Sequence, residues 1–71
     1  MRQDQREAIE KIDYPGIRIK AVGNFVVYIQ DKHCRRNFMH TCVLAGWSAQ
    51  ETVEKIIEIC DRLKGVQNEQ I

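Results

Sequence analysis

The chain has 71 residues, of which 44% are apolar, and this is enough for one small globular domain with a limited core. Eleven basic and ten acidic residues leave a net charge of +1, which gives no overall electrostatic argument for a nucleic-acid or membrane partner. No stretch approaches the ~20 apolar residues that span a bilayer, and the first residues lack the apolar run of a secretory signal. Three cysteines without paired short spacing favour free thiols and a cytoplasmic location.

The first residues of the chain favour a short helix. Asp4 is suited to cap this helix, and Glu7 lies three positions later, where it completes a capping box. Pro15 then stops the helix, because its ring fixes its own backbone angle and pushes the preceding residue out of the helical region. We therefore predict a first helix over residues 3–13.

The next segment has the pattern of a β-hairpin. Apolar and charged residues alternate from Ile17 onward, which is the period-two pattern of a half-buried strand. Gly23 and Asn24 suit a tight turn, and residues 25–29 are aromatic or aliphatic throughout, as in a return strand. The sequence predicts a hairpin over residues 17–30. Because both faces of its second strand are apolar, we expect that strand to be covered on both sides or to pair at an edge.

After the hairpin, the apolar spacing changes from two residues to about 3.6. This spacing predicts a helix over residues 32–45, with Asp31 as its cap and Gly46 as its stop. The apolar residues that carry it are Cys34, Phe38, Cys42 and Ala45.

A last helix is predicted from Ser48, whose hydroxyl and the carboxylate of Glu51 form a capping box. Gly65 is expected to end this helix, with Lys64 in a last turn that favours a cation. Its apolar stripe consists of Val53, Ile56, Ile57, Cys60 and Leu63.

These elements predict the α+β class. The expected domain spans residues 1–71 in the order helix, strand, strand, helix, helix, with a Gly-Trp-Ser corner from Gly46 to Ser48 between the last two helices. Residues 1–2 and 66–71 are expected to be frayed ends.

A metal site is the first functional question, because the stretch over residues 30–42 holds two histidines and two cysteines. In a helix, His33 and His40 would lie roughly 10 Å apart along the axis, and Cys34 and Cys42 would point to the other side. Four ligands that converge on one zinc ion are therefore not expected. We predict no metal and no cofactor, and we interpret the cysteines as packing residues.

A basic patch is hidden by the balanced total charge. Residues 1–13 carry three basic and four acidic side chains, residues 14–47 carry five and one, and residues 48–71 carry three and five. The middle segment is therefore predicted to hold phosphates or an acidic protein surface, and a solvated face is the alternative. The predicted binding residues are Arg18, Lys20, Lys32, Arg35 and Arg36.

The motif "CVLAGWSAQETV", residues 42–53, resembles the turn of helix-turn-helix DNA-binding domains. The resemblance covers about residues 38–57 and implies that the last helix enters the major groove. Two departures argue against this. Val53 comes one position later than the usual spacing, and the helix would bring acidic residues to the phosphates, which is the wrong sign. An ordinary corner between two helices is the preferred interpretation.

The wide apolar stripe of the last helix predicts a symmetric dimer, because one hairpin and one helix leave part of it uncovered. The predicted interface residues are Trp47, Val53, Ile56, Ile59 and Leu63. No glycine-rich phosphate loop, nucleophile motif or paired carboxylates favour an enzyme. We expect a small non-catalytic binding or regulatory module that acts through protein–protein contacts, as a homodimer and without a membrane partner. Nucleic-acid binding through the basic patch is the alternative.

Overall fold

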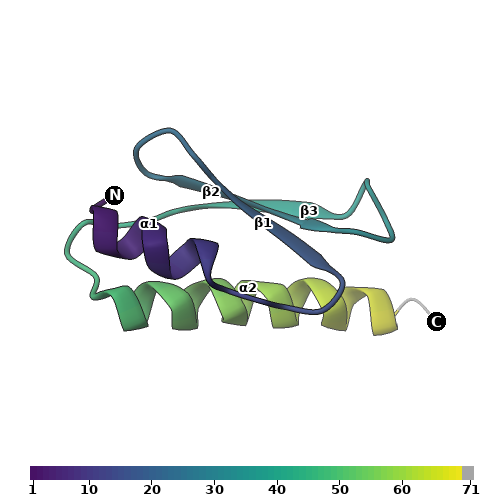
Figure 1. The fold of residues 1–71 in the computed structure, drawn as a ribbon. Helices are drawn as coiled ribbons and strands as arrows, with labels where there is room; N and C mark the ends of the chain where they lie inside the picture. Colours follow the sequence, from purple (N-terminus) through teal and green to yellow (C-terminus); the bar gives the residue numbers. More distant parts are fainter. Residues whose placement is uncertain (70–71) are drawn as a thin grey trace.

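The computed structural model describes the backbone of residues 1–69 and the side chains of residues 1–64. The elements are α1 (Gln3–Glu10), β1 (Ile17–Val22), β2 (Val26–Asp31), β3 (Phe38–Cys42) and α2 (Ala49–Glu69). The strands form one antiparallel sheet in the order β1-β2-β3, and both helices lie against the same face of it (Figure 1). The predicted α+β class is confirmed.

The helix predicted over residues 32–45 is wrong. Residues 32–37 form a loop, and β3 (Phe38–Cys42) follows it. A spacing of four places Phe38 and Cys42 on one side of a helix, but four is also even, so the same residues share one face of a strand. The position of β2 decides between the two, because its second edge needs a hydrogen-bonding partner and β3 supplies it.

Asp31 caps a turn and not a helix. One of its carboxylate oxygens, Oδ1, accepts hydrogen bonds from the backbone amides of His33, at 2.7 Å, and Cys34, at 3.2 Å. The backbone amide of Asp31 donates to the carbonyl of Asn37 at 3.0 Å, which closes the loop. The capping chemistry expected of this carboxylate is therefore present, and it shapes the loop over residues 32–37.

The predicted hairpin is confirmed. Its register runs from Ile17 opposite Asp31 to Val22 opposite Val26. Gly23 takes a φ of 68° in the turn, a left-handed conformation that favours glycine.

Three residues of the predicted apolar stripe of α2, Ile56, Cys60 and Leu63, are buried in the core, whereas Ile57 is exposed. The buried apolar residues are Ile9, Ile17, Val27, Ile29, Val43, Ile56, Cys60 and Leu63. The helix starts as expected, because the hydroxyl of Ser48 accepts from the amide of Glu51 at 3.0 Å. It does not end at Gly65 but continues to Glu69, since one glycine inside a helix costs only about 1 kcal/mol. Residues 66–69, predicted to be frayed, are thus helical, and residues 70–71 lie outside the described residues.

α1 is shorter than predicted and has a different cap. It ends at Glu10, and Asp4 lies inside its first turn instead of capping it. The side-chain oxygen of Gln5 accepts from the amide of Arg2 at 2.8 Å. Arg2, predicted to lie in a frayed end, donates from its guanidinium to the carbonyls of Trp47, at 2.7 Å, and Ala45. Within the described residues, neither helix has both the length and the apolar character needed to cross a membrane.

Candidate functional site

The face of the sheet that points away from both helices is open among the described residues (Figure 1). Because successive side chains of a strand alternate between faces, the register places every second residue on this outer face. Its side chains form three rows across the strands, which are Arg18, Gln30 and Phe38, then Lys20, Tyr28 and His40, then Val22, Val26 and Cys42.

Three rings of the outer face contact one another, and we call Tyr28, Phe38 and His40 the aromatic cluster. Tyr28 and Phe38 are stacked, with ring centroids 5.5 Å apart and ring planes at 23°. His40 lies 4.9 Å from Tyr28 and 5.6 Å from Phe38, and it meets Phe38 edge-on. Phe38 keeps 46% of its surface exposed. The cluster therefore presents ring faces and edges to solvent.

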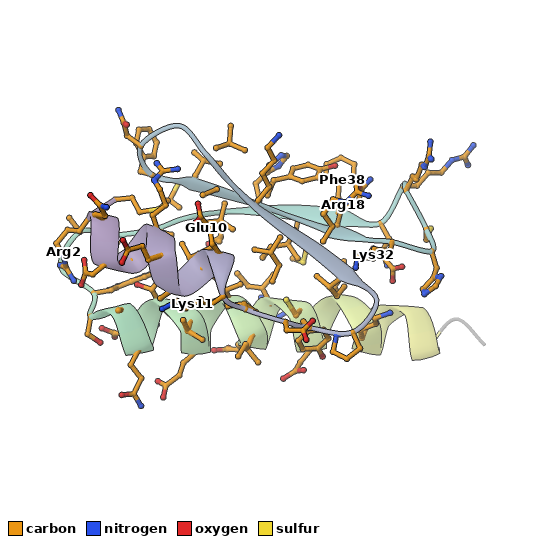
Figure 2. All side chains as sticks on the ribbon, viewed as in Figure 1. Arg2, Glu10, Lys11, Arg18, Lys32 and Phe38 are labelled. Carbon is orange, nitrogen blue, oxygen red and sulfur yellow. The ribbon has the colours of Figure 1, made fainter. Side chains whose placement is uncertain are left out.

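Basic side chains border the aromatic cluster. Figure 2 shows Arg18 and Phe38 together on the outer side of the sheet, and the register places them in one row. Lys20 lies opposite Tyr28 in the next row. All five predicted basic residues are exposed, two of them on β1 and three in the loop over residues 32–37.

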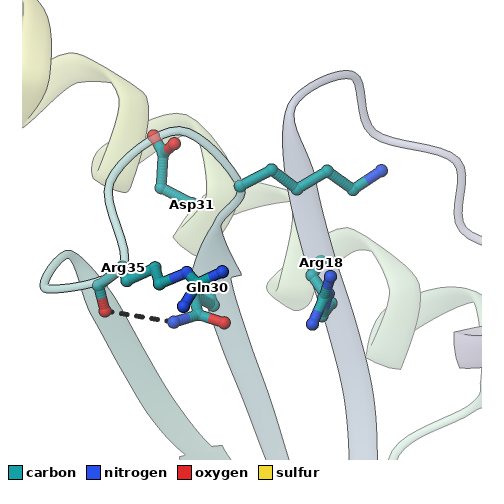
Figure 3. A pocket seen from close by; sticks show the side chains of 5 residues that line it. Arg18, Gln30, Asp31 and Arg35 are labelled. Carbon is teal, nitrogen blue, oxygen red and sulfur yellow. Dashed lines mark hydrogen bonds between the residues drawn. The ribbon is translucent and has the colours of Figure 1, made fainter.

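Three of the basic residues surround one pocket. Arg18, Lys32 and Arg35 line it together with Gln30 and Asp31, and its volume is about 410 Å³ (Figure 3). The amide nitrogen of Gln30 donates to the backbone carbonyl of Arg35 at 3.0 Å, which ties the loop to the sheet. The structure therefore brings part of the predicted patch to one point. Arg36 and Lys20 do not line this pocket.

The negative charge of Asp31 is directed away from the outer face. Asp31 is the only acidic residue in residues 14–47, and its side chain is buried. Burial by itself raises the pKa of Asp31, but the amide of His33, the charge of Lys64 and the amide of Cys34 outweigh it and hold the pKa below its ordinary value. These groups stabilise the negative charge of Asp31. The positive charges of Arg18, Lys32 and Arg35 at the pocket are therefore not neutralised by a contact with Asp31.

The residues predicted to form a dimer interface differ in how far they are buried within the chain. Ile56 and Leu63 lie in the core of the chain itself, with 0% and 3% of their surface exposed. Val53, Ile59 and Trp47 are half-buried. The sheet that packs on α2 has three strands instead of the predicted two, so more of the apolar stripe is covered within the chain than the sequence suggested.

The flank of α2 next to α1 carries an apolar groove of about 340 Å³. Val53 and Ile57 from α2 line it together with Ile12 and Tyr14 from the segment after α1. On the opposite flank, the ammonium group of Lys55 lies 5.1 Å from the centre of the Trp47 ring, in a cation–π contact.

The histidines and cysteines are dispersed, although not by the helix that was expected. His33 and Cys34 lie in the loop over residues 32–37, and His40 and Cys42 lie on β3. Among the residues that the structure describes, no three His, Cys, Asp or Glu side chains come together to hold a metal ion.

The predicted Gly-Trp-Ser corner between two helices is wrong, and so is the helix-turn-helix alternative, because the segment before Gly46 is a strand. β3 (Phe38–Cys42) stands where the first helix of that motif belongs, and residues 43–48 connect this strand to α2. A comparison of the chain with protein families, curated proteins and solved structures finds no significant match.

Sequence reasoning found the basic residues but missed the aromatic cluster and Gln30. Tyr28 was expected in a strand, and Phe38 and His40 were expected on different sides of a helix. Period-two alternation over Phe38–Cys42 is the signal that would have found the cluster, because it places Phe38 and His40 on one face.

Proposed function

We propose that the protein binds nucleic acid through the outer face of its sheet. The observation that supports this proposal is that the aromatic cluster lies beside Arg18 and Lys20 on the outer face and adjoins the pocket that Arg18, Lys32 and Arg35 line. Aromatic rings stack on bases, and Lys and Arg side chains bind phosphates. The outer face offers both kinds of group within one row of side chains, in Arg18 and Phe38.

The charge distribution supports the same ligand. The net charge of +1 is small, but acidic side chains are confined to the segments that form the two helices and their connections, except for the buried Asp31. A polyanion would therefore meet cations on the outer face and acids on the helical side. Because the two sides differ in the sign of their charge, we expect a nucleic acid to approach the outer face of the sheet and not the helices.

An acidic protein partner on the same patch was the first expectation from the sequence. Such a partner needs the cations but makes no particular use of three adjoining rings, whereas a nucleic acid uses both. We therefore place nucleic acid first. In this proposal the protein is a cytoplasmic binding module and carries out no chemistry of its own.

The proposal is tested by fluorescence anisotropy with labelled oligonucleotides at about 50 and 200 mM salt. We expect log affinity to fall linearly with log salt concentration. A variant with Arg18→Gln and Arg35→Gln should bind more weakly and should reduce the slope by about 0.7–0.9 for each lost phosphate contact. The matched control is Lys11→Gln, which removes one positive charge from the segment that follows α1 (Figure 2).

Two results would contradict the proposal. One is the absence of binding to any oligonucleotide at the lower salt concentration. The other is an equal loss of affinity in the Lys11 control and in a single Arg18→Gln variant, because this would show that net charge and not the outer face determines binding.

Self-association is a second proposal, and the apolar groove beside Val53 and Ile57 favours it. A two-fold contact across α2 would bring its acidic residues close to their copies, so the dimer should become more stable as salt concentration rises. Light scattering over a range of micromolar concentrations tests this. A monomer at every concentration and at both high and low salt excludes a homodimer through α2.

A further inference from the structure

We infer that the outer face selects single-stranded nucleic acid, with an unpaired base on the aromatic cluster and an adjoining phosphate in the pocket lined by Arg18, Lys32 and Arg35. This inference rests on the proposed function and specifies its ligand. It comes from the juxtaposition of exposed ring faces and a cationic pocket in the same row of the sheet.

The aromatic cluster requires an accessible base face. In a duplex, each base is stacked between its neighbours and shows only its edges in the grooves. In a single strand, a base can leave its neighbours and lie on an aromatic ring, and this contact tolerates any base because every base has a π face. Phe38 is the most suitable ring, because it is 46% exposed and rests on Tyr28 behind it.

The pocket supplies the phosphate contact next to this ring. Gln30 lines the pocket and is paired with Phe38 in the same row, so the pocket and the aromatic cluster adjoin on the outer face. Neighbouring β-strands are about 4.8 Å apart. The ring of Phe38 and the cations of the pocket are therefore close enough to bind adjacent nucleotides of one nucleic-acid strand. The second row extends the surface with Lys20 and His40 on either side of Tyr28.

The backbone of the loop that carries Lys32 and Arg35 is held in place before any ligand arrives. Gln30 holds the carbonyl of Arg35 from the outer face, and Asp31 holds the amides of His33 and Cys34 from the helical side. The amide of Lys32 donates to the carbonyl of Gly16 at 2.9 Å, which fixes the start of the loop to the start of β1. Because this backbone is already ordered, phosphate binding requires less ordering of the loop.

The test compares a labelled oligothymidine of about ten nucleotides with a blunt duplex of the same length, by fluorescence anisotropy of the full chain. We expect the single strand to bind at least about tenfold more tightly than the duplex. Phe38→Leu should weaken single-strand binding by about 5- to 100-fold and leave duplex binding nearly unchanged. Circular dichroism confirms that each variant folds.

The chain offers matched controls for both contacts. Phe25 is 57% exposed in the hairpin turn and lies outside the aromatic cluster, so Phe25→Leu makes the same chemical change without loss of affinity. Arg36 lies next to Arg35 in the loop but does not line the pocket. Arg35→Gln should therefore weaken binding more than Arg36→Gln does.

Each outcome decides one point. Equal or tighter binding of the duplex overturns this inference and leaves the proposed function standing, whereas no binding of either ligand overturns both. Equal losses in Phe38→Leu and Phe25→Leu show that the cluster does not stack on a base. Single-strand binding that depends on the arginines but not on Phe38 reduces the site to a phosphate contact and also overturns the inference.

Discussion

The carboxylate of Asp31 and the ammonium group of Lys64 lie 3.5 Å apart, and this ion pair joins the end of β2 to α2. The Asp31 side chain is fully buried, whereas 28% of the Lys64 side chain is exposed. The second oxygen of the same carboxylate accepts the amides of His33 and Cys34. One buried side chain therefore holds both the loop that carries the pocket cations and the helix behind the sheet.

We expect Asp31→Asn to destabilise the protein by about 1–3 kcal/mol at neutral pH, because hydrogen-bonded charge is lost from a buried position. The pKa of Asp31 is held below its ordinary value of 3.8, so the folded chain binds this proton less readily than the unfolded chain does. The stabilisation is therefore present above the ordinary pKa and is lost as pH falls through the pKa of the folded state. Urea unfolding, followed by circular dichroism from neutral to about pH 3, measures this effect.

The matched comparison is the pH dependence of the two proteins. The free energy of unfolding of the wild-type chain should fall more steeply with acid than that of Asp31→Asn. Parallel curves for the two proteins would show that Asp31 titrates alike in the folded and unfolded chains.

Two glycines allow the contribution of Lys64 to be separated from backbone strain. Gly16 and Gly23 both have positive φ angles, of 77° and 68°, so alanine at either position should cost about 1–2 kcal/mol. A Cβ atom at Gly16 would lie 2.7 Å from Nζ of Lys64, whereas at Gly23 it would meet open space. Gly16→Ala therefore displaces Lys64 from Asp31 and should destabilise the protein more than Gly23→Ala.

Urea unfolding of both alanine variants gives the difference between them. We expect this difference to disappear when both are made in a Lys64→Met background, because no ammonium group remains to be displaced. A difference that persists in that background would assign the extra cost to the backbone at Gly16 and not to Lys64.

The local elements of the fold were predictable because their signals are short-range. The hairpin over residues 17–30 follows from strict alternation and a Gly-Asn turn, and the start of α2 follows from Ser48 and Glu51. β3 (Phe38–Cys42) was not predictable in this way, because a spacing of four residues fits both a helix and a strand. The edge of β2 that β1 does not pair with decides between them, because β3 supplies its hydrogen-bonding partner, and the spacing of apolar residues within one segment does not reveal this pairing.

The candidate site was predictable in its charges and not in its geometry. The excess of basic residues is visible in the sequence, but which cations meet depends on the loop that Asp31 and Gln30 hold. Tyr28 and His40 are cross-strand neighbours only in the register that the structure shows, and a shift of one residue would send them to opposite faces. The aromatic cluster is therefore a product of strand pairing.

A buried glutamine, Gln5, joins α1 to the segment before α2 through hydrogen bonds. The amide nitrogen of Gln5 donates to the carbonyls of Leu44, at 2.9 Å, and Trp47, at 3.0 Å. Gln5→Leu would remove both of these hydrogen bonds from a buried position and would also take the side-chain acceptor from the amide of Arg2. We expect a loss of about 1–3 kcal/mol, which lowers the melting temperature by several degrees. Gln3→Leu on the exposed side of α1 is the control, and it should change the stability by less than about 0.5 kcal/mol. Equal changes in melting temperature for Gln5→Leu and Gln3→Leu would show that the hydrogen bonds of Gln5 do not stabilise the fold.

The three cysteines should differ in reactivity. Burial, together with the carboxylate of Asp61, raises the pKa of the Cys60 thiol to about 11, so this thiol stays protonated at neutral pH. Cys42 is exposed and Cys34 is half-buried. We expect an aromatic disulfide reagent, followed by its absorbance, to react fastest with Cys42 and to reach Cys60 only when the chain unfolds. Cys42→Ser should remove the fastest phase of the thiol reaction. Unfolding in urea should make the slowest phase, that of Cys60, fast. Rapid reaction of Cys60 in the folded Cys42→Ser variant would show that the core beneath the sheet opens more readily than its packing implies.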